Sequence, residues 1–189
     1  TTESQVHREM ASGLPCPIGF KNGTDGNVRV AIDAMQAAAH PHHFLSISPE
    51  GAPTIVSSAG NQDCHVILRG GKTPNYDAAS VEAACAELSR SGQRARLMID
   101  ASHANSAKKH ENQIRVCADV GQQIAGGESR IIGVMVESNL LAGRQDLKTG
   151  CSLTFGQSIT DACIGWDETE KLLEDLARAG EGRCEPHPA

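Results

Sequence analysis

Short apolar runs alternate with amphipathic helical patterns along most of this chain. Four runs have the length and composition typical of buried strands, at residues 17–21, 65–71, 96–102 and 131–138. Because their apolar residues are nearly continuous rather than alternating with polar ones, we expect strands that are covered on both faces. That kind of strand is typical of a parallel sheet.

A helical pattern follows each predicted strand. The glycine-rich turn at residues 22–26 leads into a helix that ends near Ala39. Asp77 is the predicted N-cap of a second helix, and Gly92 ends it.

Two more helices complete this pattern. The third ends at the glycine pair 126–127. The last helix is predicted to begin at Asp167, which forms a capping box with Glu170 three residues later, and to end at Gly180.

The segment 40–60 interrupts the alternation. The runs "HFLSI" (43–47) and "PTIVSS" (53–58) flank the turn "SPEG", the pattern of a β-hairpin inserted between regular units. The histidine-rich stretch "HPHH" (40–43) follows a helix end and contains proline, so we interpret it as a solvated loop rather than a metal site.

The tail at residues 181–189 is predicted to be disordered.

Strands that are each followed by a helix predict an α/β fold, either a doubly wound sheet or a (β/α)8 barrel. Arg69, His103 and Glu137 stand at successive strand ends and are equally spaced, which indicates a steady repeat without the reversal of a doubly wound sheet. About four such units are too few to close eight strands. Residues 1–180 are therefore predicted to be the C-terminal part of one TIM barrel, carrying its later strands and helices and an inserted hairpin.

Charge and composition narrow the class of protein. The chain of 189 residues has a formal net charge of -6 and no basic run longer than Lys108-Lys109, which argues against a nucleic-acid partner. It has no apolar run of about 18 residues, so no membrane partner is expected. The seven cysteines are odd in number and show no C-x-x-C spacing, which favours reduced thiols and a cytoplasmic location.

Polar side chains stand at or near the predicted strand ends. Lys21 and Arg69 lie beside glycine-rich turns, where a phosphate or carboxylate ligand is the natural partner. His103, Glu137 and Asp161 are one imidazole and two carboxylates, a set that suits Mn, Fe, Co or Zn. Three ligands leave positions open, as a catalytic metal needs.

A structural interpretation stays open for each of these residues. His103 could be hydrogen-bonded at a strand end, Glu137 could cap a turn, and Asp161 could be the N-cap of a short helix. Lys21 and Arg69 could form salt bridges inside a barrel without binding any ligand.

Five motifs carry a resemblance to a known family: "GFKNGTDG" (19–26), "ILRGGKTPNY" (67–76), "DASHANS" (100–106), "GVMVES" (133–138) and "SITDACIGW" (158–166). With the opening "ESQVHRE", they closely resemble the microbial, aromatic-amino-acid-regulated class I type of 3-deoxy-D-arabino-heptulosonate-7-phosphate (DAHP) synthase. The likeness runs from Thr1 to about Ala179.

The resemblance implies a (β/α)8 barrel that condenses phosphoenolpyruvate with erythrose 4-phosphate and water, releasing phosphate, in the first step of the shikimate pathway. It implies that Lys21, Arg69 and Asn105 bind substrate and that Lys21 and His103 are catalytic. It also implies a divalent metal held by three of the family's four ligands, here His103, Glu137 and Asp161.

The family's fourth ligand, a cysteine on an early strand, would lie before Thr1, as would the Lys-Pro-Arg-Thr segment that holds the sugar phosphate. The opening residues also lack an initiator Met, so we expect the chain to begin inside a larger protein and to have little synthase activity alone. A non-catalytic half-barrel that needs a partner is one alternative. The other is 3-deoxy-manno-octulosonate-8-phosphate synthase, against which the hairpin and "SITDACIGW" argue.

Feedback regulation by an aromatic amino acid is a further implication of the resemblance. In the family, the inserted hairpin and the segment before the lysine strand form the effector pocket, which here points to Gly13, Leu14, Pro15, Phe44 and Ser46. Pro15 stands where a serine is common, which removes a hydroxyl and an N–H group. The full-length protein is expected to be a homo-oligomer, a dimer or a tetramer.

Overall fold

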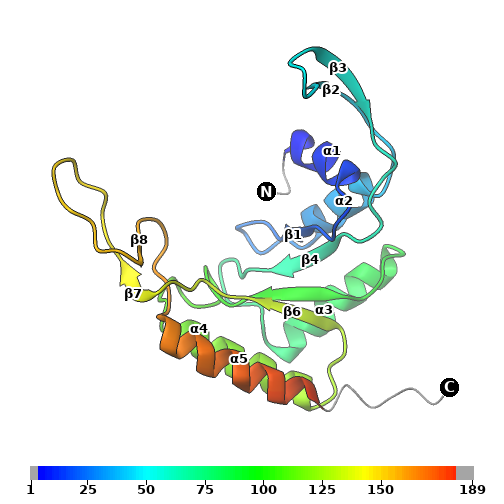
Figure 1. The fold of residues 1–189 in the computed structure, drawn as a ribbon. Coiled ribbons are helices and arrows are strands. Elements are labelled where there is room, and N and C mark those ends of the chain that lie inside the picture. Colours follow the sequence, from blue (N-terminus) through cyan, green and yellow to red (C-terminus); the bar gives the residue numbers. More distant parts are fainter. Residues whose placement is uncertain (1–3, 182–189) are drawn as a thin grey trace.

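A four-stranded parallel sheet forms the centre of the fold (Figure 1). The computed structural model describes residues 4–181. All four predicted strands are present and pair in parallel with their neighbours: β1 (Gly19–Lys21), β4 (His65–Leu68), β5 (Leu97–Asp100) and β6 (Ile131–Met135). The prediction of a parallel α/β fold is therefore confirmed.

The order of the strands in the sheet, β1-β4-β5-β6, follows their order along the chain. A doubly wound sheet needs a reversal of this order, and the described strands of this sheet contain none. They form an open arc with β1 and β6 at its two edges.

Each strand of the central sheet is followed in the chain by a helix. These helices are α2 (Arg29–Ala38), α3 (Ala78–Arg90), α4 (Asn112–Ala125) and α5 (Trp166–Glu181). Asp77 is the N-cap of α3, as predicted, and its Oδ1 accepts the N–H of Ser80 at 3.0 Å. At the other end of α3, Gly92 has a left-handed φ of 70°, a conformation that glycine adopts without steric cost.

The hydrophobic core lies between the sheet and its helices. Side chains on a strand alternate between the two faces of the sheet, so only every second strand residue enters this core. Leu68 and Ile99 are both 0% exposed and belong to the same cluster as Ile32, Val81 and Val120 of α2, α3 and α4. Burial of such side chains contributes about 1.5–3 kcal/mol each, which anchors the strand ends that carry the polar residues.

The predicted hairpin lies outside the central sheet. Strands β2 (His43–Ile47) and β3 (Pro53–Ser57) pair antiparallel, and Figure 1 shows them extending away from the rest of the fold. Phe44 lies on the less exposed face of β2, whereas Leu45 and Ile55, on the other face, are 81% and 69% exposed. The hairpin therefore presents an apolar face that the described chain leaves open.

Three elements were not anticipated from the sequence: α1 (Gln5–Gly13), β7 (Leu141–Arg144) and β8 (Gln157–Ser158). Helix α1 has no side-chain cap and buries only two of its residues. Strands β7 and β8 are short and pair with each other, and Gly143 of β7 also bridges Cys163. None of the three has apolar residues repeating at helix or strand spacing over a long stretch, and that repeat is the main sequence signal for secondary structure.

The predicted start and end of the last helix need correction. Helix α5 begins at Trp166, so Asp167 lies in its first turn rather than at the N-cap, and the carboxylate of Glu168 accepts the N–H of Gly165 instead. Glu181, predicted to begin the disordered tail, is the last residue of α5, and the rest of that tail, 182–189, lies outside the described residues. Within the described part, every helix is too short or too polar to cross a membrane.

Candidate active site

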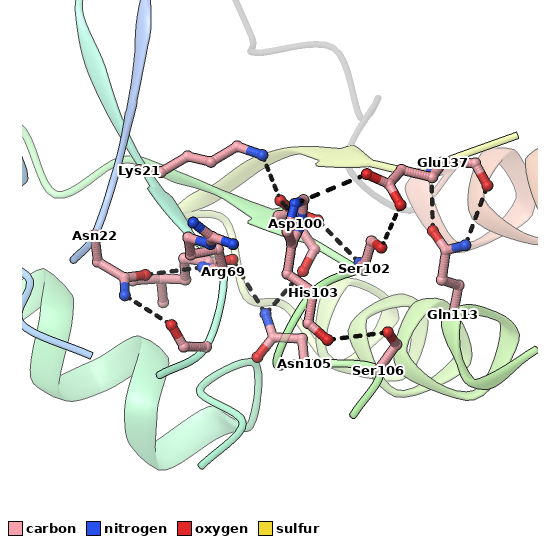
Figure 2. Close-up of polar contacts among 12 residues, drawn as sticks. Lys21, Asn22, Arg69, Asp100, Ser102, His103, Asn105, Ser106, Gln113 and Glu137 are labelled. Atoms are coloured by element: carbon pink, nitrogen blue, oxygen red, sulfur yellow. Dashed lines mark hydrogen bonds and ion pairs between the residues drawn. The ribbon is translucent and has the colours of Figure 1, made fainter. Parts of the chain in front are cut away.

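The four parallel strands bring the predicted side chains together at the carboxyl end of the sheet. Lys21 is the last residue of β1, Arg69 follows β4, and Glu137 lies two residues after β6. His103 follows Asp100, the last residue of β5, and Figure 2 shows these side chains around a common centre. Neighbouring parallel strands end at the same edge of a sheet, where barrel enzymes hold their active sites.

Asp100 is the charged centre of this group. Its side chain is fully buried, and its Oδ2 accepts a hydrogen bond from Nζ of Lys21 at 2.7 Å. Nδ1 of His103 lies 2.9 Å from the same oxygen, outside hydrogen-bonding geometry. The N–H of Ser102 donates to Oδ1 at 2.9 Å. A buried carboxylate needs such partners, because an unpaired one would cost several kcal/mol.

The backbone at His103 is bent sharply as the chain leaves β5. His103 has a φ of 54°, in the left-handed region that few non-glycine residues adopt. Its carbonyl oxygen accepts the N–H of Lys108 at 2.8 Å, which holds the turn. Costly backbone conformations of this kind are concentrated at functional sites.

Glu137 is held at both its backbone and its carboxylate. Gln113 of α4 donates from Nε2 to the carbonyl oxygen of Glu137 at 3.1 Å and accepts its N–H at 2.8 Å. Oγ of Ser102 donates to Oε2 of Glu137 at 2.7 Å, and Oε1 lies 3.8 Å from Nε2 of His103. The carboxylate is therefore placed beside the imidazole.

The residues of the predicted metal site are close enough to share one ion. His103, Glu137 and Asp161 each offer a ligand atom, and these atoms lie within 4.8 Å of one another. Zinc bonds of about 2.0–2.2 Å bring neighbouring ligands to roughly 3–4 Å, so only small adjustments are needed. With Nδ1 of His103 beside Asp100, Nε2 is the ring nitrogen on the side of Glu137. The donor set and its arrangement fit a divalent metal.

Two cavities adjoin this group. One, of about 450 Å³, is lined by Arg69 and all three candidate metal ligands, together with Lys108 and His110. The other, of about 620 Å³, is lined by Lys21 and Arg69. Cationic side chains beside an acidic cluster suit a ligand that carries a phosphate or carboxylate as well as a polarised oxygen.

Asn105 lies inside the fold, between the ends of β4 and β5. Its side chain is 1% exposed, and its Nδ2 donates to the carbonyl oxygens of Leu68 at 3.1 Å and Asp100 at 2.8 Å. Its Oδ1 accepts the N–H of Asn75 at 2.8 Å. Nδ2 bonds to the backbone of both strand ends, so Asn105 holds the ends of β4 and β5 together, and its contact with a substrate stays a prediction.

Asn22 holds the backbone on the other side of Arg69. It is 2% exposed, its Oδ1 accepts the N–H of Arg69 at 2.8 Å, and its Nδ2 donates to the carbonyl of Gly70 at 2.9 Å. The loop that carries Arg69 is thus tied to the end of β1.

The chain is similar to proteins of one known family. Residues 1–174 match the model of the DAHP synthetase I family. The chain belongs to this family. It is 60% identical over 183 residues to the Phe-sensitive phospho-2-dehydro-3-deoxyheptonate aldolase of Escherichia coli, with 97% of this chain and 52% of the relative covered. It is 58% identical over 180 residues to the phospho-2-dehydro-3-deoxyheptonate aldolase of Haemophilus influenzae, with 95% and 50% covered.

Further relatives extend the match. A Trp-sensitive enzyme of the same name from Escherichia coli is 52% identical, with 97% of this chain and 53% of the relative covered. The structure of phospho-2-dehydro-3-deoxyheptonate aldolase from Francisella tularensis has a TM-score of 0.91 and 51% identity, and the match covers 97% of this chain and 53% of that one. The chain spans about half the length of the curated relatives that it matches.

Some site residues of this DAHP synthetase I chain were not singled out from the sequence. Asp100 had a usable signal, because it is a charged residue that closes the buried run "LMID". Gln113 and Asn22 had none, since each acts through a contact with a residue distant in the chain. Such contacts depend on the tertiary fold.

The expected effector residues lie at the end of α1, just after it, and along β2 of the hairpin. Gly13 ends α1, Leu14 follows it, and Phe44 is on β2. A Cβ atom on Gly13 would lie 3.5 Å from Cβ of Ser58, which directly follows β3. Leu14 lines the 620 Å³ cavity beside β1, a cavity whose lining does not include Phe44.

The cysteines within residues 4–181 are free thiols. Burial raises the pKa of Cys117 to about 12, and burial also raises the pKa of Cys163, two residues from Asp161. Both side chains therefore stay protonated at neutral pH.

Proposed function

We propose that this chain carries much of the active site of a DAHP synthase, which condenses phosphoenolpyruvate with erythrose 4-phosphate and water to give DAHP and phosphate, the first step of the shikimate pathway. One observation carries the proposal. The chain belongs to the DAHP synthetase I family, and its predicted anion-binding and metal-binding side chains lie together beyond the carboxyl end of the sheet: Lys21, Arg69, His103, Glu137 and Asp161.

Between heavy atoms, two single bonds form in this reaction and one breaks. C3 of phosphoenolpyruvate attacks the aldehyde carbon of erythrose 4-phosphate, and water adds its oxygen at C2, from which phosphate leaves. The water gives up two protons, of which one leaves with phosphate and the other balances the proton that the aldehyde oxygen receives as it becomes a hydroxyl. Lys21 is our candidate for that transfer, because its Nζ is held 2.7 Å from buried Asp100 at the mouth of the site.

Phosphoenolpyruvate carries a phosphate and a carboxylate, and we assign both to the cationic residues. Arg69 offers a planar fork of donors at the boundary of the two cavities, and Lys21 offers a point charge beside it. The family match favours the four-carbon sugar phosphate over the substrate of a 3-deoxy-manno-octulosonate-8-phosphate synthase.

We assign His103, Glu137 and Asp161 to a divalent metal, Mn, Fe, Co or Zn. When bound, the metal supplies Lewis acidity toward the aldehyde oxygen or the attacking water. Asp100 keeps the imidazole of His103 turned so that Nε2 faces Glu137.

We further propose that the four parallel strands are consecutive strands of a closed (β/α)8 barrel. Their monotonic order and the similarity to the Francisella tularensis structure support this. Gly19 supports it as well. A Cβ atom there would lie 2.3 Å from Cδ1 of Ile67, so the Ile67 side chain packs over the bare backbone of Gly19.

Feedback regulation by an aromatic amino acid is also proposed, at the base of the hairpin. The Phe-sensitive and Trp-sensitive names of the Escherichia coli relatives support it. We place the protein in the cytoplasm as a dimer or tetramer, and the exposed apolar face of β2 and β3 supports self-association.

The test measures DAHP and phosphate formation by the protein as the cell makes it, with erythrose 4-phosphate or arabinose 5-phosphate beside phosphoenolpyruvate. We expect turnover with the four-carbon sugar phosphate and its loss by about 100-fold or more in His103→Ala, since a metal ligand is removed. His43→Ala, in the exposed hairpin, is the control and should keep wild-type turnover. Preference for the five-carbon substrate, or full turnover by His103→Ala, would contradict the proposal.

A further inference from the structure

Gln113 is a polar side chain in a place from which water is excluded. It lies in the first turn of α4 and is 0% exposed, and burying an amide costs free energy unless its polar atoms find partners. Both polar atoms pair with one residue. Oε1 accepts the N–H of Glu137 at 2.8 Å, and Nε2 donates to the carbonyl oxygen of Glu137 at 3.1 Å (Figure 2).

These two hydrogen bonds from Gln113 act beyond the pairing of β5 with β6. The pairing of β5 with β6 ends at Asp100 and Met135, so Glu137 lies beyond the ladder. Ile164 donates its N–H to the same carbonyl oxygen at 3.0 Å, which ties the segment after Asp161 to Glu137. Ser138 and Ile164 also form a parallel bridge, and the Gln113 amide adds two hydrogen bonds from a helix to that strand-type support.

Ser102 completes the support at the carboxylate end of Glu137. Its Oγ donates to Oε2 at 2.7 Å, and its own N–H donates to Oδ1 of buried Asp100 at 2.9 Å. The other carboxylate oxygen, Oε1, faces Nε2 of His103 at 3.8 Å. Glu137 is thus fixed at its backbone and at one oxygen, and its second oxygen is directed at the neighbouring candidate ligand.

We infer that Gln113 is a positioning residue for the metal site: by clamping the backbone of Glu137, together with Ser102 on Oε2, it holds Oε1 toward His103 before any metal binds. The inference rests on the metal site of the proposed function. A ligand that is already in place loses less conformational freedom on binding, which raises affinity. Partners that orient metal ligands typically change affinity about 10–100-fold when they are removed.

Gln113→Met tests this, because it keeps the length of the side chain and removes both hydrogen bonds. We expect the Kd for Mn²⁺, measured from the electron paramagnetic resonance signal of the free ion, to rise about tenfold or more. The visible absorption spectrum of the Co²⁺-loaded protein should change as well, since Glu137 is no longer held.

The matched control is Gln123→Met on the same helix. Nε2 of Gln123 donates to the carbonyl oxygen of Tyr76 at 2.9 Å, a structural contact that involves none of the site residues. This variant should lower the melting temperature and leave the Mn²⁺ Kd and the Co²⁺ spectrum unchanged.

Each outcome separates the inference from the proposed function. If Gln113→Met has the wild-type Kd and spectrum, the inference is wrong and the proposed metal site stands. If the wild-type protein binds none of Mn²⁺, Fe²⁺, Co²⁺ or Zn²⁺, the metal site fails and the inference fails with it. If Gln113→Met does not fold, Ser102→Ala decides: about tenfold weaker Mn²⁺ binding supports the inference, and unchanged binding overturns it.

Discussion

Asp100 joins the anion-binding and metal-binding halves of the candidate site. One buried oxygen of this residue faces both Nζ of Lys21 and Nδ1 of His103, at 2.7 and 2.9 Å. Lys21 ends β1 and His103 follows β5, and β4 lies between these two strands in the sheet. A single charge therefore fixes the relative positions of the proposed proton donor and the proposed metal ligand.

Asp100→Asn should lower the free energy of unfolding by about 2 kcal/mol, less than for a fully buried pair because the Lys21 side chain is 30% exposed. Urea unfolding followed by circular dichroism measures this change. Asp33→Asn is the control, since its partner Arg29 is exposed, and it should cost less than about 0.5 kcal/mol. Equal effects of the two substitutions would show that Asp100 does not have this role.

At the scale of elements, helix α3 illustrates how local sequence determines local structure. Asp77 accepts hydrogen bonds from the N–H of Ser80 at 3.0 Å and from its hydroxyl at 2.7 Å. Both partners lie within three residues, so the cap could be predicted from the sequence. Helix α5 shows the limit of such reasoning: Asp167 and Glu170 have the spacing of a capping box, but the helix begins one residue earlier.

Asp77→Ala should destabilise the protein by about 1 kcal/mol at pH 7, because it removes the cap of α3. The hydrogen bond from the Ser80 side chain lowers the pKa of Asp77 below its ordinary value of 3.8. A lowered pKa means that the contribution is complete above the ordinary value and is lost as pH falls through the value in the folded protein. Unfolding free energies of both proteins should therefore converge at acidic pH.

Ser89→Ala, near the other end of α3, is the control and should change stability by less than about 0.5 kcal/mol. A gap between wild type and Asp77→Ala that stayed constant down to pH 2 would count against the cap.

At the scale of the whole molecule, the hairpin of β2 and β3 has an apolar face that stays exposed in the described chain. Leu45 and Ile55 are directly opposite each other on its exposed face, and Ile47 beside them is 72% exposed. Apolar side chains gathered on one exposed face are typical of a surface that another molecule covers. Figure 1 places this face far from α5 and the carboxyl end of the described chain.

Leu45→Lys should reduce self-association of the protein, because it places a charge in the middle of that face. Sedimentation velocity over a range of concentrations measures the effect. Leu173→Lys, at a position of α5 that is 53% exposed, is the control and should leave the oligomeric state unchanged. An identical mass distribution for Leu45→Lys and wild type would exclude the hairpin face as the contact.

The sequence by itself determined the strands of the central sheet, the helices that follow them and the residue types at the strand ends. Apolar period and length are local properties, so the four strands, the helices between them and the polar residues that follow them could all be read along the chain. The family resemblance was also visible in the sequence, in the motifs around Lys21, Arg69, His103, Glu137 and Asp161.

Only the tertiary structure decided which atoms meet. The Asp100 contact with Lys21, the Gln113 clamp on Glu137 and the use of Asn105 on the backbone all join residues from different elements. Hydrogen bonds depend on distances of about 3 Å and on angles, and those are set by how the helices pack on the sheet rather than by spacing along the chain. For that reason the candidate site could be anticipated in composition but not in its supporting contacts.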